Sequence, residues 1–391
     1  MKKPLTYISL FSSAGVGCYG FKLNDFECIA TNEILPKRLK IHAFNNKCRY
    51  KTGYIGGDIT SNEVKQKLFN ELELWQKKHN IETPDVLIAT PPCQGMSVAN
   101  HKKNDEMSRN SLVVESIKLT NKINPKYFVF ENVRAFSNTI CTDVDGVTKP
   151  IKDAIDYNLG GYYNILHKVV NFKYYGSNSS RTRTLVIGVR KDIPNVTPYD
   201  IFPKKQKSKT LRELIGDLPS LTKKGEISND IFHSCREFDQ RMLPWIENLK
   251  EGQSAFDNSE PKRIPHRIIN GKIIHNKSKN GDKYARWYWD KEGPCVHTRN
   301  DILASQNTIH PSDNRVFSMR ELMRMLSIPE SFKWSNIDTH ELNMLTDLDK
   351  RKFLKKEELN IRHCLGEAVP TKVFESIASN VRKAIKSQSL S

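Results

Sequence analysis

The chain has 391 residues, 38% of them hydrophobic and 27% charged, which is ordinary for a soluble globular protein of two or three domains. No stretch approaches the roughly 20 apolar residues of a membrane span, and the start, MKKPLTYISLF, lacks the apolar segment and cleavage site of a signal peptide. We therefore expect a cytoplasmic protein without a membrane segment. The formal net charge of +18, from 62 Lys+Arg and 44 Asp+Glu, favours a polyanionic partner, above all nucleic acid.

The first half of the chain alternates strand-like and helix-like stretches. This alternation predicts a parallel, doubly wound α/β sheet. The last two strands are separated only by FKYYGSNSSRTR, which is short for a helical crossover, so they are expected to pair antiparallel. The predicted strands are 6–11, 28–33, 54–59, 85–90, 126–133, 163–171 and 184–190. One helix is predicted to end near Lys78, and two others are predicted around 111–122 and 150–158.

The sequence changes character after about residue 195. Residues 196–300 are rich in Lys, Arg, Asn, Ser, Pro and Gly, and the stretches 203–210 and 265–289 are basic, the second with interleaved aromatics. Basic residues position phosphates, and polar or aromatic ones can reach bases, so we interpret this region as a nucleic-acid face rather than a solvated loop region. The predicted domains are therefore 1–195, completed by 362–391, and a smaller, partly irregular domain with hinge segments at 196–361.

Three helices are predicted near the end of the chain. The stretch 318–332, SMRELMRMLSIPESF, has a helical apolar stripe ended by Pro329. Residues 347–370 predict a charged helix followed by a turn containing Gly366, and 371–386 form an amphipathic pattern.

The eight cysteines show neither a CxxC pair nor a partner histidine pair with zinc-finger spacing, so no disulfide framework and no structural metal are expected. Seven of them are interpreted as small buried hydrophobes. The exception is Cys93 in ATPPCQGMS, which follows the buried run DVLIA beside Pro91 and Pro92. The cysteines are at 18, 28, 48, 93, 141, 235, 295 and 364.

Three motifs at strand ends outline a nucleoside pocket. The glycine-rich turn FSSAGVGCYG (11–20) would bring backbone close to a ligand beside a helix N-terminus. Glu33 ends the second strand, where an acidic residue can bind ribose hydroxyls, and Asp58 follows the third, where it could accept a bond from an adenine amino group. Each alone could be an unrelated turn residue.

Cys93 and Glu131 stand at the ends of the fourth and fifth strands, which are expected to share one crevice. A thiolate that attacks a ring carbon needs a partner for the electron density, and a carboxyl group donating to a ring nitrogen would serve if burial keeps it protonated. Arg181 and Arg183, in SSRTRTLVIG (179–188), are expected on one strand face, suited to phosphate or a base carbonyl, or to solvent.

In this order, the motifs resemble those of the DNA (cytosine-5)-methyltransferases over nearly the whole chain except roughly 220–285. The resemblance implies a Rossmann-like class I S-adenosylmethionine-dependent methyltransferase fold, with a mostly parallel doubly wound sheet and a final antiparallel strand, plus a smaller irregular target-recognition domain. The motifs are FSSAGVG, NE, GDIT, PPCQGMS, SRNSL, ENV, SSRTRTLVIG, RVFSMRELMRMLSIPESF and GEAVP.

The resemblance also implies roles in catalysis. Cys93 looks like the nucleophile that adds to cytosine C6, and Glu131 like the group that engages N3 and the exocyclic amine. Arg183 looks like the partner of the base O2, with Arg181 beside it. The target cytosine would be flipped out of the duplex at a cost of a few kcal/mol, and the thiolate would make C5 electron-rich enough to attack the methyl sulfonium. No metal is implied.

Binding residues follow from the same resemblance. Residues 94–110 look like a mobile loop that closes over DNA, with Gln94, Ser97 and Arg109 as expected contacts. The implied contacts of S-adenosyl-L-methionine are Phe11, Ser13, Gly15, Glu33, Ile34, Asp58, Ile59, Pro92, Leu112, Glu367, Ala368 and Val369.

Four departures from the family pattern concern the cofactor rim and the segment before the arginines. Ser13 and Val16 stand where glycines are usual, Asn178-Ser179 replaces Pro-Gln, and Glu367 replaces Asn. None alters the candidate catalytic residues, so an active enzyme is expected.

The leading interpretation is a bacterial cytoplasmic methyltransferase, monomeric on double-stranded DNA, that protects a specific sequence from a partner restriction endonuclease. A tRNA cytosine methyltransferase and a non-catalytic DNA-binding regulator remain alternatives. A nicotinamide-dependent oxidoreductase is disfavoured because it leaves PPCQ and the basic region unexplained.

Overall fold

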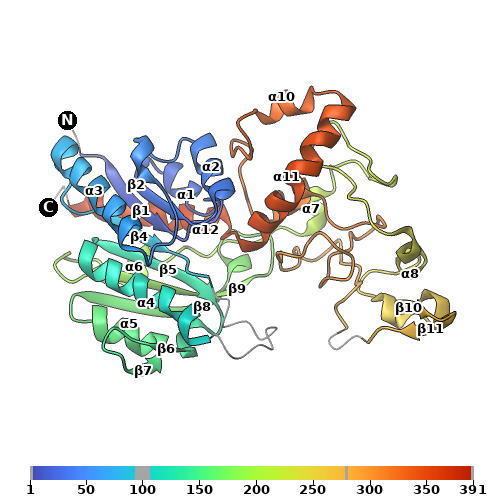
Figure 1. The fold of residues 1–391 in the computed structure, drawn as a ribbon, viewed down its shortest axis with the longest axis horizontal. Coiled ribbons are helices and arrows are strands. Elements are labelled where there is room, and N and C mark those ends of the chain that lie inside the picture. Colours follow the sequence, from blue (N-terminus) through green and yellow to red (C-terminus); the bar gives the residue numbers. More distant parts are fainter. Residues whose placement is uncertain (1–2, 93–105, 278–280, 389–391) are drawn as a thin grey trace. The chain divides into compact units, whose positions relative to one another are not determined.

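The computed structural model describes residues 3–92, 106–277 and 281–388, and side chains between 106 and 111 are outside that description. The chain divides into two compact units (Figure 1). Unit 1 comprises Met1–Tyr175, Thr182–Lys205 and Thr371–Ser391, and unit 2 comprises Gly176–Arg181 and Gln206–Pro370.

Unit 1 is built on a seven-stranded sheet in the order β3-β2-β1-β4-β5-β9-β8. The first five of these strands are mutually parallel, whereas β9 lies antiparallel between β5 and β8. The predicted parallel sheet and the antiparallel last pair are therefore confirmed. The strands are β1 (Leu5–Leu10), β2 (Phe26–Glu33), β3 (Tyr54–Gly56), β4 (Val86–Ala89), β5 (Tyr127–Val133), β8 (Tyr163–Asn171) and β9 (Thr182–Arg190).

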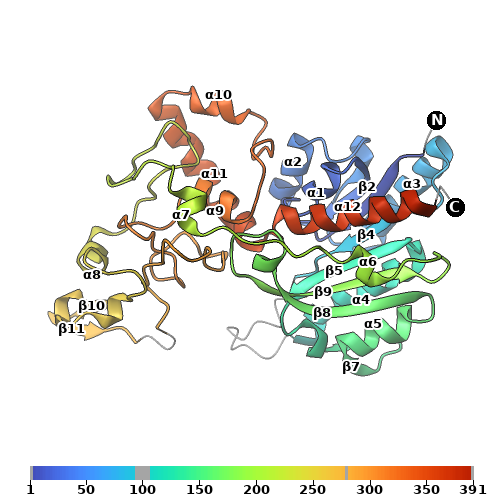
Figure 2. The same ribbon diagram turned by 180° about the vertical axis from the view of Figure 1, so that it is seen from behind.

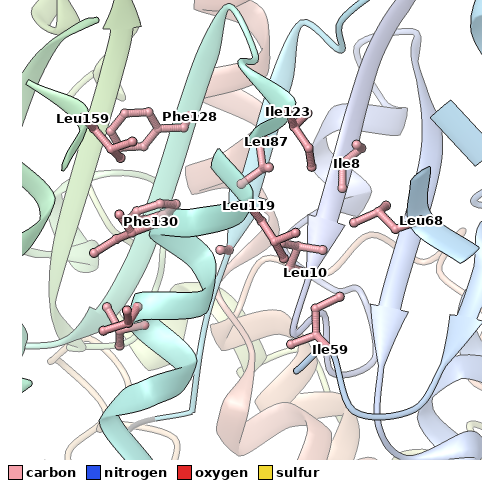
Figure 3. Packing of buried hydrophobic residues seen from close by; sticks show 14 of the residues in the cluster. Ile8, Leu10, Ile59, Leu68, Leu87, Leu119, Ile123, Phe128, Phe130 and Leu159 are labelled. Carbon is pink, nitrogen blue, oxygen red and sulfur yellow. The ribbon is translucent and has the colours of Figure 1, made fainter. Parts of the chain in front are cut away.

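Helices cover both faces of this sheet, which explains why its central strands are almost continuously apolar. In Figure 1, α3, α4 and α5 lie on one face, and Figure 2 shows α6 and α12 crossing the other. Figure 3 shows the core under the first face, where Leu10, Leu68 and Phe130 belong to one buried cluster. The helices of unit 1 are α1 (Tyr19–Lys22), α2 (Pro36–Phe44), α3 (Asn62–His79), α4 (Glu106–Ile123), α5 (Ile151–Leu159), α6 (Pro198–Ile201) and α12 (Thr371–Gln388).

A short hairpin in unit 1 was not predicted. It consists of β6 (Ile140–Thr142) and β7 (Thr148–Pro150), around a turn with Gly146 at φ +79°. Asp143 stabilises it by accepting from Lys149 and Asn158, each at 2.8 Å. Strands of three residues carry too little periodicity to stand out in a sequence.

Unit 2 is largely irregular, as the sequence predicted. Its small hydrophobic cluster contains Trp245, Tyr284 and Ile309. The buried Arg286 donates to the carbonyl oxygens of His310 and Ile246, at 2.8 and 2.9 Å, and so satisfies backbone acceptors that no regular ladder serves. The regular elements are α7 (Leu211–Ile215), α8 (Leu243–Ile246), β10 (His266–Ile269), β11 (Lys272–His275), α9 (Met319–Met325), α10 (Thr339–Asn343) and α11 (Asp347–Glu367).

A buried ion cluster begins helix α9. Arg315 donates to both carboxylate oxygens of Glu321, at 2.9 and 2.8 Å, and to Asp313 at 3.0 Å. Ser318 and Glu321 also form a capping box, in which each side chain bonds the other residue's backbone amide. The cluster thus joins the start of the helix to the loop before it. The helix ends at Met325, before the predicted stop at Pro329.

The prediction of a turn at Gly366 is wrong. Helix α11 continues through Glu367, and Gly366 is needed for close packing, because a Cβ there would lie 2.3 Å from the amide nitrogen of Thr298. A glycine before a proline-containing segment resembles a helix stop in the sequence, and only the tertiary contact distinguishes the two roles.

Unit 1 extends to Lys205 and resumes at Thr371, and unit 2 also includes Gly176–Arg181, which lie within the range 1–195 expected for the first domain. Residues up to Lys205 remain in unit 1, where Asn380 of α12 donates to the Phe202 carbonyl at 2.8 Å. Residues 362–370 remain in unit 2, where Arg362 donates to Phe317 and Asn300 carbonyls.

Six of the seven described cysteines are buried free thiols, as predicted, and Cys295 is partly exposed. Among the residues that the structure describes, no helix combines the length and apolar character needed to cross a membrane.

Substituting Gly366→Ala should destabilise the protein by about 1–3 kcal/mol, because the added methyl group meets backbone atoms that cannot move aside. The usual gain of an alanine inside a helix, up to about 1 kcal/mol, is smaller than this cost. Gly161→Ala is the matched control, since a Cβ there meets nothing within 4 Å. Thermal or urea unfolding measures both changes, and equal stability of the two variants would contradict the packing role.

Lowering the pH should destabilise unit 2 through His310. Burial lowers the pKa of His310 from its ordinary 6.5 to about 4, so the folded protein keeps the ring neutral while the unfolded chain takes up a proton. Stability is therefore full above pH 6.5 and falls towards pH 4, by up to about 3 kcal/mol.

The variant His310→Asn keeps an acceptor for the amides of Ser312 and Asp313, which bond Nδ1 of His310, but it does not titrate. Urea unfolding between pH 4 and 7 should show a flatter dependence for this variant. Parallel curves for the variant and the wild type would contradict the assignment.

Candidate active site and cofactor site

The candidate site of unit 1 lies at one edge of the sheet. The parallel strands β1, β2, β3, β4 and β5 all end there, and the register places Arg183, near the start of β9, opposite Val133 at the end of β5. Side chains that are far apart in the sequence are thereby brought to one edge, where ligands of open α/β sheets bind.

The turn after β1 has a strained backbone that a buried histidine supports. Phe11 and Ser13 have φ of +55° and +46°, which non-glycine residues rarely adopt. Nε2 of His42 lies 2.8 Å from the Ser13 carbonyl oxygen. The His42 ring also packs against Gly15, because a Cβ there would lie only 2.8 Å from the ring. Burial holds the pKa of His42 well below its ordinary 6.5, so the ring is neutral and Nε2–H donates to Ser13.

Sequence reasoning missed His42, and the only signal for it was Ser13 in place of a family glycine. A second support comes from Ser12, whose amide donates to the Asn32 carbonyl at 3.1 Å. The glycines at 15, 17 and 20 also match the GxGxxG spacing of dinucleotide-binding turns, so this turn alone does not distinguish the cofactor.

The ends of β2 and β3 present carboxylates of different exposure. Glu33 is buried and accepts from the amide of Leu35 at 3.0 Å, whereas Asp58 is exposed and accepts from the amide and hydroxyl of Thr60. Ile34, which directly follows β2 and is another expected cofactor contact, is 59% exposed. Ile59 is only 2% exposed and packs into the core, so its backbone rather than its side chain remains for a ligand.

Asn32 holds the two strand ends together. Its amide donates to the carbonyl oxygens of Ile55 and Gly57, at 3.1 and 3.0 Å. The sequence motif NE drew attention to Glu33 and left this positioning role unrecognised.

The segment after β4 is fixed from two sides. The hydroxyl of Thr90 donates to the Phe11 carbonyl at 2.9 Å, and the amide of Asn132 on β5 donates to the Pro91 carbonyl at 2.9 Å. Pro92 is exposed and Leu112 is half-buried on α4. Cys93, Gln94 and Ser97 lie outside the described residues, and Arg109 falls within α4 with its side chain outside the description.

Glu131 and Arg183 form an ion pair at the end of β5. The pairing of Glu131 with Leu185 puts Arg183, two residues earlier on β9, on the same face as a diagonal neighbour. Nε of Arg183 lies 3.3 Å from Oε1 of Glu131, which is 7% exposed. A carboxyl group and a guanidinium side by side match the donor and acceptor pattern of a planar base edge.

Arg181 has different partners from Arg183. Its guanidinium is buried in unit 2 and donates to the carbonyl oxygens of Val296 and Gly366, at 2.8 and 2.9 Å. The alternation of the two arginines predicted one shared face. In the structure, Arg181 contacts backbone carbonyls of unit 2, whereas Arg183 contacts the carboxylate of Glu131.

The segment before Arg181 replaces the usual Pro-Gln by polar residues that bond within unit 2. The amide nitrogen of Asn178 donates to Met325 at 2.9 Å, and its side-chain oxygen accepts from the amide of Lys209 at 2.9 Å. The hydroxyl of Ser179 donates to the Pro294 carbonyl at 2.6 Å. These bonds explain how Asn178 and Ser179 replace a rigid proline.

The last predicted cofactor residues belong to unit 2. Glu367 is exposed at the end of α11, and Ala368 and Val369 follow it as buried residues. Over the described ranges, no group of three or more His, Cys, Asp and Glu side chains is arranged to hold a metal ion.

Comparison with known proteins agrees with this architecture. The model of the C-5 cytosine-specific DNA methylase family matches residues 5–383. The Type II methyltransferase M1.HgaI of Avibacterium volantium is 30% identical, covering 97% of this chain and 99% of the relative. M.NgoPII of Neisseria gonorrhoeae is 31% identical, covering 98% and 97%.

Solved structures share the fold at lower identity. A putative DNA modification methyltransferase encoded within a prophage of E. coli has a TM-score of 0.63 and 18% identity, covering 98% of this chain and 99% of that one. The S. pombe Dnmt2 methyltransferase has a TM-score of 0.58 and 15% identity, covering 97% and 99%. These likenesses confirm the predicted methyltransferase fold.

The family model spans almost the whole chain, and full-length relatives share about 30% of its residues. This chain therefore belongs to the C-5 cytosine-specific DNA methylases, and it is an enzyme that methylates C5 of cytosine in DNA.

Proposed function

We propose that the enzyme takes its methyl group from S-adenosyl-L-methionine and delivers it to a flipped cytosine in a specific duplex sequence, through a covalent adduct of Cys93 with C6. The observation that carries the proposal is the Glu131–Arg183 pair at the edge where the parallel strands end. It supplies a base-binding edge beside the segment that leads to Cys93.

The residues at the ends of β1, β2 and β3 fit a nucleoside cofactor. The left-handed turn after β1 allows a ligand to approach the backbone closely. The buried carboxylate of Glu33 can bind hydroxyl groups of a ribose, and the exposed side chain of Ile34 can pack on the face of a ring. Asp58 adds an acceptor for an amino group. S-adenosyl-L-methionine, when bound, supplies an electrophilic methyl group.

The other proposed cofactor contacts, as the family resemblance implies them, are Phe11, Ser13, Gly15, Ile59, Pro92, Leu112, Glu367, Ala368 and Val369. Glu367 would add a carboxylate towards an ammonium group. The family match and the arrangement of the turn in unit 1 support this set.

The proposed chemistry assigns one role to each catalytic side chain. The Cys93 thiolate adds to C6, and the electron pair of the C5–C6 double bond moves to C5. Glu131 holds a proton at N3, which disperses the negative charge, and Arg183 binds the base O2 while it orients Glu131. Once C5 carries the methyl group, solvent takes the C5 proton, the C–H electron pair re-forms the C5–C6 double bond, and the thiolate leaves C6.

Arg181 acts in this proposal as a positioning residue. Its bonds to Val296 and Gly366 hold the end of the segment that continues into β9, two residues before Arg183. A change at Arg181 therefore acts on Arg183 through the backbone.

Unit 2 is proposed to read the duplex, with Gln94, Ser97 and Arg109 adding contacts from the segment after Cys93. The relatives are Type II methyltransferases, which supports a role that protects one sequence from a partner restriction endonuclease. We further propose a monomer on DNA that works in the bacterial cytoplasm.

The variant Cys93→Ser should lose turnover by several orders of magnitude while still binding duplex DNA, because a hydroxyl group is a poor nucleophile here. Duplex DNA with 5-fluorocytosine at the target should trap a denaturation-resistant adduct with the wild type, since fluorine cannot leave as a proton does. Mass spectrometry locates the adduct, and attachment at another residue would contradict the role of Cys93.

The same assay tests the alternatives with labelled methyl donor, duplex DNA and tRNA as substrates. Transfer to tRNA but not to duplex DNA would favour an RNA substrate. Equally little transfer by the wild type and Cys93→Ala, with DNA binding retained, would favour a non-catalytic regulator.

The variant His42→Ala should raise the KM for S-adenosyl-L-methionine about tenfold with little change in kcat. Without the bond to Ser13, the strained turn can relax, and strain of this kind is worth about 1–3 kcal/mol. His42→Gln, whose amide can donate to the same carbonyl, should recover part of the affinity.

The exposed His363 on α11 provides the control variant His363→Ala. Calorimetric titration with S-adenosylhomocysteine separates affinity from catalysis. An unchanged dissociation constant for His42→Ala would contradict the supporting role of this histidine.

A further inference from the structure

Strands β10 and β11 form a regular ribbon, the 266–275 hairpin, in the irregular unit 2. Figure 1 shows it beside α8. The register pairs His266 with His275 and Ile269 with Lys272. Asn270 and Gly271 have φ of +49° and +76°, as the two-residue type I′ turn requires. The hairpin therefore has a defined geometry on both faces.

Its base is attached to the body of unit 2. The ring of His266 lies 5.5 Å from that of Trp245, which belongs to the hydrophobic cluster, and its Nδ1 bonds the Ile264 carbonyl at 2.8 Å. Nε2 of His275 bonds the Pro261 carbonyl at 2.9 Å. These contacts anchor the first residue pair and leave the remainder of the hairpin free.

Beyond the base, four isoleucines are exposed to solvent. Their exposed fractions run from 40% at Ile273 to 69% at Ile268. Cross-strand pairing puts Ile268 with Ile273 on one face and Ile269 with Ile274 on the other. An antiparallel sheet usually packs one face on a core, and clustered exposed apolar side chains mark an interaction surface.

The charge around the hairpin indicates the partner. The sequence from Pro261 to Gly281 contains no Asp or Glu, and Arg267 and Lys272 extend from the same face as Ile269 and Ile274. In the described part of the chain, the nearby Arg263 pairs with Glu247 and Glu260, whereas neither Arg267 nor Lys272 forms an ion pair with a carboxylate. Uncompensated positive charge interleaved with apolar side chains suits a nucleic-acid groove, and it opposes contact with a second basic copy.

We propose that the 266–275 hairpin enters the major groove of the target duplex and distinguishes base pairs there. The major groove admits a two-stranded ribbon, and apolar side chains can contact the methyl group of thymine. Ile269 and Ile274 supply the apolar contact, and Arg267 and Lys272, on the same face, bind the flanking phosphates. The inference rests on the proposed function, in which unit 2 reads the substrate.

The test uses the full chain and two double variants. Ile269→Thr with Ile274→Thr removes apolar surface but keeps β-branched residues that favour the strand, and Arg267→Gln with Lys272→Gln removes charge. The control for the first is Leu348→Gln, at a 65% exposed leucine of α11, and the control for the second is Lys355→Gln on the same helix. Thermal midpoints equal to the wild type establish that the variants fold.

Each protein methylates a library of duplexes with randomised sequence, which is then read by bisulfite sequencing. We expect the isoleucine variant to lose about tenfold in kcat/KM on the preferred site and to accept additional bases at one or more positions. We expect the charge variant to bind all sequences more weakly and to reduce the salt dependence of binding by about two phosphate contacts.

Wild-type sequence preference and kcat/KM in both double variants would overturn the inference. So would a wild-type dimer in sedimentation that the isoleucine variant converts to monomers without a change in preference. The proposed function fails separately, if the wild type methylates no duplex or does not bind S-adenosylhomocysteine in calorimetry. If the wild type methylates duplex DNA and both double variants keep its sequence preference and kcat/KM, only the role of the hairpin is overturned.

Discussion

The antiparallel pairing of β9 with β5 is the constraint on which the candidate site depends. Parallel strands end at one edge of the sheet, and a further parallel strand would begin at the opposite edge. Arg183, near the start of β9, would then lie about 20 Å from the end of β5, the length of a seven-residue strand. The reversed direction instead places it 3.3 Å from Glu131. The antiparallel topology thus brings together two catalytic candidates that no local sequence motif could bring together.

The second unit depends on arginines in another way. It has few strands or long helices, so many of its backbone carbonyls lack a partner in a regular ladder, and Arg181, Arg286 and Arg362 donate to them from inside. Arg315 is held by Glu321 and Asp313, and removing one partner of such a buried pair costs about 3–5 kcal/mol. Part of the positive charge of unit 2 therefore stabilises the fold.

The sheet could be predicted from the sequence because its strands are buried on both faces and stand out as continuous apolar runs. The candidate catalytic residues could be predicted because ENV and SSRTR follow a recognisable family order. His42 and Asn132 could not, since their functions arise from one bond each to a distant carbonyl, at Ser13 and Pro91. Gly366 misled the prediction for a similar reason, because a glycine that allows close packing has the same letter as one that ends a helix.

The internal arginines of unit 2 bear on how enzymes of this kind diverge. Their bonds to main-chain carbonyls do not depend on the side chains of the residues that supply them, because every residue carries such an oxygen. Loops between the anchored points can therefore exchange side chains over generations while the scaffold keeps its donors. If unit 2 reads the duplex as proposed, a lineage can acquire a new target sequence by drift in these loops, without rebuilding the unit that presents them.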